Sequence, residues 1–133
     1  MHSIIFSYKE LNRRFMPIIP LTLYGPRESL LVEAYVDSGA TFSIFSLELA
    51  KGLKLDLKNA RRQMFVVGDG SFIPAQLIKM PIQVGEEKFI CDIAFSDRLN
   101  VGFNLLGRLG VFEYFDEIIF RESKKEIVFR WKK

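Results

Sequence analysis

The chain has 133 residues, of which 49% are hydrophobic, and thirteen of them are phenylalanine. This composition predicts a single folded domain over residues 1–133 and excludes a disordered chain. The net charge of +3 comes from basic pairs scattered along the sequence rather than from one basic stripe, so we expect no nucleic-acid binding.

Cysteine and histidine usage excludes several kinds of chemistry. The single cysteine, Cys91, permits neither an intramolecular disulfide nor a thiolate zinc cluster, and we expect it to be a small buried residue. The single histidine, His2, lies at the terminus, so Ser-His-Asp, Cys-His and histidine–metal catalysis have no residue to use. We therefore expect no metal and chemistry based on carboxylates, lysines or hydroxyls. Without a membrane-spanning run or a signal-peptide pattern, the expected location is cytoplasmic, with no membrane contact.

In chain order, short apolar runs bounded by turn residues predict many strands and two short helices. A helix is expected at 47–51, capped by Ser46 and ended by Gly52 in the left-handed conformation. Another is expected at 108–115. The predicted strands are 4–8, 15–24, 30–36, 64–67, 71–84, 89–95, 101–106 and a final hairpin of 117–121 with 126–130. This pattern predicts a mainly β barrel or sandwich.

The strand at 30–36 ends in Asp37-Ser38-Gly39-Ala40. A carboxylate at the end of a hydrophobic strand is unfavourable unless nearby N–H and O–H groups bind it, and Ser38 and the turn amides are the candidates. Alone, the pattern is also typical of an ordinary surface turn. Further along, Gly68-Asp69-Gly70 between apolar arms predicts a hairpin, since these residues accept the positive φ of a primed turn.

Together with Leu105-Leu106-Gly107-Arg108, these motifs resemble, in order and rough separation, those of the retropepsin-like aspartic proteases. The resemblance covers about residues 20 to 115. It implies a mainly β, closed acid-protease barrel with two short helices and a flap hairpin over the site.

The resemblance also implies an activity, aspartic endopeptidase, in which two carboxylates share a proton and activate a water. The motif occurs once, so the second carboxylate is expected from Asp37 of a second copy, in a homodimer. No cofactor is implied, and the substrate is an extended peptide. The implied catalytic residues are Asp37, Ser38 and Gly39. Those implied to bind substrate are Ala40, Thr41, Val67, Gly68, Asp69, Gly70 and Leu105, with Leu106, Gly107 and Arg108 as structural support.

Some positions depart from the retroviral pattern. Thr41 occupies the place of an acid that pairs with the motif arginine, so the partner of Arg108 stays open. Ala40 has no hydroxyl to stabilise an ionised Asp37, so we expect cleavage to extend toward neutral pH. The final hairpin, residues 117–130, is longer than in retroviral chains. The resemblance therefore does not imply how the dimer interface is built. The alternative function is a catalytically silent peptide-binding or dimerisation module of the same fold, which a monomer in solution would favour.

Overall fold

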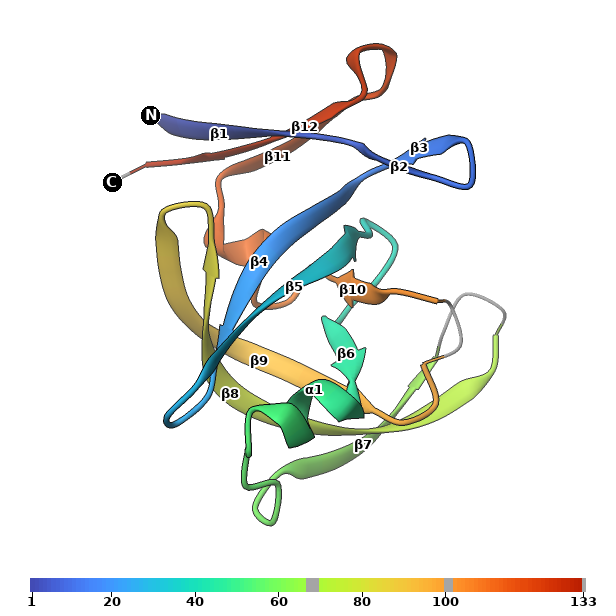
Figure 1. Cartoon of the computed structure of the whole chain (residues 1–133), viewed down its shortest axis with the longest axis vertical. Helices are drawn as coiled ribbons and strands as arrows, with labels where there is room; N and C mark the ends of the chain where they lie inside the picture. The colour runs from blue at the N-terminus through green and yellow to red at the C-terminus, as the bar shows by residue number, and fades with distance from the viewer. Residues whose placement is uncertain (67–69, 100–101, 133) are drawn as a thin grey trace.

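Strands dominate the computed structural model, which describes residues 1–66, 70–99 and 102–132 (Figure 1). The strands are β1 His2–Ser7, β2 Lys9–Leu11, β3 Arg14–Met16, β4 Ile18–Tyr24, β5 Ser29–Val36, β6 Ile44–Ser46, β7 Arg61–Val66, β8 Phe72–Val84, β9 Glu87–Ser96, β10 Asn104–Leu106, β11 Glu117–Arg121 and β12 Glu126–Trp131. Helical segments are short: α1 at Leu47–Gly52, and 3₁₀ turns at Phe112–Tyr114 and Glu122–Lys124. The prediction of a mainly β fold is confirmed.

A ring of hydrogen-bonded strands forms the body of the molecule (Figure 1). Its order is β4-β5-β10-β6-β9-β8-β7, and it closes where Thr22 and Leu23 of β4 pair with Gln83 and Ile82 of β8. Strand β10 runs parallel to β5, and β6 runs parallel to β9, so two short central strands lie between the long ones. Closure leaves few free strand edges and encloses the core.

The core is apolar and aromatic because alternate residues of each strand face inward. The largest fully buried side chains include Phe45, Phe95, Ile93 and Leu106. Cys91 is also buried, as predicted, and burial raises the pKa of its thiol to about 12. Such a thiol stays protonated and acts as a small hydrophobic residue.

A second sheet, of order β1-β12-β11, packs against the ring. The predicted final hairpin is confirmed, with Glu117 opposite Arg130 and Arg121 opposite Glu126. The pairing of β1 with β12 was not predicted, because the two strands lie at opposite ends of the sequence. The ring of Phe115 packs edge-on against Phe129 at 4.9 Å, joining this sheet to the barrel.

One of the two helix predictions is wrong, and the other is confirmed with a different end. Residues 108–115 form turns and a single 3₁₀ turn instead of a helix, because the Arg108 and Leu109 amides bond to carbonyls of residues 40 and 41. Gly110, at φ +89°, interrupts the segment further. The helix at 47–51 is confirmed with its Ser46 cap, but it extends through Gly52, and the left-handed residue is Lys54 at φ +55°.

Strand boundaries differ from prediction near the amino terminus and the site. Pro17 divides the run 15–24 between β3 and β4, and β2 with β3 makes a small hairpin that the sequence did not predict. Strand β6 was also missed. The strand predicted at 101–106 is the shorter β10, and residue 101 lies outside the described residues. Over the described ranges, no helix is long and apolar enough to cross a membrane.

Candidate active site

The turn at residues 37–40, here called the Asp37 turn, follows β5 directly. The Gly39 N–H donates to Asp37 Oδ1 at 2.8 Å, and the Ala40 N–H donates to the Asp37 carbonyl at 3.1 Å. A Cβ on Gly39 would lie 3.3 Å from that same carboxylate oxygen. The turn therefore binds the half-buried carboxylate through its own backbone, as the sequence predicted for the amides.

Backbone hydrogen bonds to strand β10 and to the residues after it hold the Asp37 turn in place. The Asp37 N–H donates to the Leu106 carbonyl at 3.0 Å, and the Arg108 N–H donates to the Ala40 carbonyl at 2.9 Å. Gly107 passes so close that an added Cβ would lie 2.3 Å from the Phe42 carbonyl oxygen. Only glycine fits there, and the motif at 105–108 thus packs against the motif at 37–40.

Two polar side chains complete this support. Ser43, fully buried, accepts the Gly107 N–H on its Oγ at 2.9 Å. Asn104 donates from Nδ2 to the Glu33 carbonyl at 2.8 Å and accepts the Ser46 N–H on Oδ1 at 3.0 Å. Asn104 therefore links β5 to Ser46, the residue before α1. Its side chain binds one backbone carbonyl and one backbone N–H that would otherwise need another partner.

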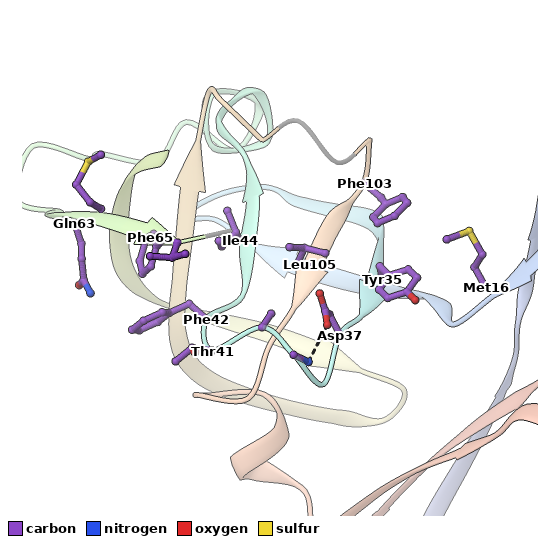
Figure 2. A pocket seen from close by; sticks show the side chains of 14 residues that line it. Met16, Tyr35, Asp37, Thr41, Phe42, Ile44, Gln63, Phe65, Phe103 and Leu105 are labelled. Carbon is purple, nitrogen blue, oxygen red and sulfur yellow. Dashed lines mark hydrogen bonds between the residues drawn. The ribbon is translucent and has the colours of Figure 1, made fainter. Parts of the chain in front are cut away.

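Asp37 faces a cleft of about 740 Å³ (Figure 2). The cleft is mostly apolar, and among the described residues that line it Asp37 is the only carboxylate. The lining residues are Met16, Tyr35, Asp37, Gly39, Ala40, Thr41, Phe42, Ile44, Gln63, Met64, Phe65, Val66, Phe103 and Leu105. An acid among apolar walls and a few backbone polar groups is typical of a ligand site.

Aromatic pairs form the two ends of the cleft (Figure 2). Tyr35 stacks on Phe103 at one end, with ring centroids 5.0 Å apart, and Phe42 packs against Phe65 at the other, at 4.6 Å. Burial and the charge of Asp37 raise the pKa of the Tyr35 hydroxyl. That hydroxyl is therefore a neutral hydrogen-bond donor at physiological pH.

Five of the ten described site residues that the sequence predicted line the cleft. Asp37, Gly39, Ala40, Thr41 and Leu105 all line the cleft. Ser38 does not.

Ser38 is exposed and lies on a separate, smaller cavity of about 260 Å³ that borders Tyr8 and Glu122. Tyr8 donates to Glu122 Oε1 at 3.1 Å, and Lys125 donates to Glu122 Oε2 at 2.9 Å. The Lys125 and Tyr8 hydrogen bonds lower the pKa of Glu122, so this cavity contains an ionised carboxylate beside the Asp37 turn.

The hairpin predicted to cover the site is present as the pairing of β7 with β8, up to Val66 opposite Phe72. Val67, Gly68 and Asp69 lie outside the described residues, and Gly70 is exposed at φ +85°. Below the tip, Gln63 to Val66 of β7 line the cleft. One arm of the hairpin, β7, therefore contributes to the cleft.

Leu106 and Gly107 are buried, while Arg108 is exposed. In the part of the chain that the structure describes, no carboxylate lies within ion-pair distance of Arg108, and its backbone makes the contacts to the Asp37 turn. The partner of the Arg108 guanidinium therefore stays an open question, while its backbone N–H donates to the Ala40 carbonyl.

Sequence reasoning missed most of the cleft walls. Tyr35 and Phe103 were not singled out, although each lies two residues before a predicted site residue, Asp37 and Leu105. Strand residues two apart share a face, so this spacing is a usable signal. Ser43 and Asn104 carry no such signal, because their partners come from distant parts of the chain.

The structure is similar to the crystal structure of a retropepsin-like aspartic protease from Rickettsia conorii, with a TM-score of 0.69 and 19% identity over 98% of this chain and 91% of that chain. No family model matches the sequence, and no curated protein matches it. The chain therefore has the retropepsin-like fold, as the sequence motifs predicted.

Proposed function

We propose that this chain is an aspartic endopeptidase that acts on extended peptides as a homodimer. The observation that carries the proposal is the placement of Asp37: a carboxylate fixed by backbone hydrogen bonds on the wall of an apolar cleft. The retropepsin-like fold supports it, since the similar crystal structure is that of an aspartic protease. Peptides bind such clefts as an added strand, with apolar pockets for alternate side chains.

The need for a second copy follows from the chemistry. One carboxylate takes a proton from water while another, still protonated, polarises the scissile carbonyl. Among the described cleft residues only Asp37 carries a carboxylate. Asp97 and Glu122 line neighbouring cavities, and Glu122 is bound to Tyr8 and Lys125. Two copies related by a two-fold axis beside the Asp37 turns bring two such groups together.

Residue roles follow from this arrangement. Asp37 is the catalytic carboxylate, and Ser38, which is exposed and does not line the cleft, contacts the second copy across the two-fold axis. Gly39 leaves room for the substrate backbone beside the carboxylate. Leu105, with Ala40 and Thr41, lines the pocket for a substrate side chain. Covering the bound peptide is the role that the resemblance implies for residues 67–70, and this part of the proposal rests on the resemblance alone.

The test compares the wild-type protein, Asp37→Asn and the control Asp97→Asn on a diverse peptide pool between about pH 4 and 7. Asparagine still accepts the Gly39 N–H but cannot share the proton, so Asp37→Asn should cut about 10²–10⁴-fold more slowly. Asp97→Asn should cut like the wild type. Sedimentation measured in parallel should give a dimer.

Other outcomes decide against the proposal. Equal cleavage by Asp37→Asn and wild type assigns the activity to another site. A folded wild type that binds peptides without cutting them is instead a catalytically silent binding module. With Ala40 beside the carboxylate, cleavage should persist toward neutral pH, and a rate that peaks near about pH 2 and is lost by about pH 5 contradicts that expectation.

A further inference from the structure

The β2–β3 hairpin, residues 9–16, stands apart from both larger sheets (Figure 1). Its base is fixed at two points: Lys9 forms an ion pair with Glu33 of β5, and Met16 lines the cleft. In Figure 2, Met16 lies beyond Tyr35, at the end of the cleft opposite Phe65. An isolated hairpin is marginally stable in water, so these two anchors hold it beside the cleft.

The strand register shows which residues of the hairpin share the face of Met16. Lys9 lies opposite Met16, and Leu11 lies opposite Arg14. Directly opposed residues, and residues two apart on one strand, point to the same face of a sheet. Because Met16 lines the cleft, Leu11 and Arg14 continue the wall of the cleft outward. Both are exposed.

This extension of the cleft is cationic. Arg13 and Arg14 are exposed, and no carboxylate among the described residues forms an ion pair with either. Glu33 is already bound to Lys9, and Glu10 lies opposite Phe15, on the other face of the hairpin. The hairpin that borders the apolar cleft at Met16 thus carries two exposed arginines that form no ion pair among the described residues.

The tip of the hairpin also places a charge at a stereochemically unfavourable position. Asn12 and Arg13 form its two-residue turn at φ +51° and +65°, the left-handed values of a primed turn. Asparagine suits the first position, but glycine is the residue that suits the second. An arginine there makes the turn less stable, so its side chain is best explained by an interaction beyond the turn.

We propose that the β2–β3 hairpin is a specificity arm that binds acidic residues in the peptide segment leaving the cleft past Met16. The proposal rests on the proposed peptidase function and narrows its substrate class to apolar cleavage sequences with an acidic flank. Arg13 and Arg14 bind flanking carboxylates, while Leu11 contacts the apolar parts of the same segment. A peptide flank fits better than a second copy, because the chain itself carries net positive charge.

The experiment uses a mixture of peptides with randomised apolar centres, flanked at both ends by three Glu or by three Gln residues. Competition in one tube gives the ratio of kcat/KM for Glu-flanked over Gln-flanked peptides. The wild type should prefer Glu flanks about fivefold, as expected of two exposed ion pairs, and less at high salt. The double variant Arg13→Gln with Arg14→Gln should lower the ratio to about one. The control Arg27→Gln, an exposed arginine outside the cleft lining, should keep the wild-type ratio.

Because the ratio is internal to each protein, a general loss of folding or dimerisation lowers both rates and leaves it unchanged. A wild-type ratio near one, or a ratio unaffected by the double variant, overturns the proposal. If the double variant instead only weakens the dimer, the hairpin binds the second copy, and the proposal is wrong.

Should the wild type cleave neither peptide set, the peptidase assignment fails by itself. Fluorescence anisotropy of the same peptides, labelled, then decides whether the arginines select acidic flanks.

Discussion

The two sides of the cleft are built in different ways. The Asp37 turn is held by backbone hydrogen bonds to residues 106–108 and by the buried Ser43, with no room for a side chain at Gly107. The β7–β8 hairpin across the cleft is joined by strand pairing, and its β7 arm carries Met64 and Val66, each more than half exposed. One side is held by backbone hydrogen bonds to the rest of the barrel, whereas the other presents exposed apolar side chains to the cleft.

The largest expected difference in stability is between alanine substitutions at two glycines, one on each side of the cleft. Gly107→Ala forces a Cβ against the Phe42 carbonyl and should lower the free energy of unfolding by about 3 kcal/mol. Gly70→Ala meets open space, and its positive φ alone should cost about 1 kcal/mol. Urea unfolding of the two variants measures the difference. Equal losses would mean that the close approach beneath the Asp37 turn relaxes readily.

A smaller effect is expected at Ser43. Ser43→Ala leaves the buried Gly107 N–H without an acceptor, which should cost about 2 kcal/mol of unfolding free energy. Ser29→Ala, at the exposed start of β5, should change it by less than about 0.5 kcal/mol. The denaturant concentrations at the unfolding midpoints of the two variants and the wild type, compared at a common dependence of unfolding free energy on denaturant, test this prediction. A stable Ser43→Ala variant would show that water replaces the hydroxyl.

The smallest effect on stability is expected on the hairpin side. Val66→Ser should change the unfolding free energy by less than about 0.5 kcal/mol, because Val66 is 63% exposed. It should still lower kcat/KM about fivefold on apolar peptides, since Val66 lines the cleft.

Leu31→Ser is the matched control, because Leu31 is also exposed but lies outside the cleft lining; it should leave kcat/KM unchanged. Equal kcat/KM for the two variants would contradict a role of Val66 in binding the peptide.

Local patterns predicted the parts of the site that depend on nearby residues. The Asp37 turn follows from a strand, an acid and a glycine in sequence, and the same acid accepts the Gly39 amide two residues later. The segment at 108–115 shows where this reasoning fails. Its apolar spacing favours a helix, but long-range amide bonds to residues 40 and 41 replace the helical pattern. Tertiary hydrogen bonds of this kind override a weak local propensity.

The sequence by itself determined the mainly β fold and the place of Asp37 in a glycine-containing turn at the end of a strand. Periodicity and turn chemistry act over a few residues, so they can be read locally. Only the tertiary structure decided that Ser43 supports Gly107, that β1 joins β12, and that the β2–β3 hairpin brings Met16 to the cleft. These contacts join residues far apart in the chain, so they depend on how the whole barrel closes. Local sequence preferences do not encode that closure.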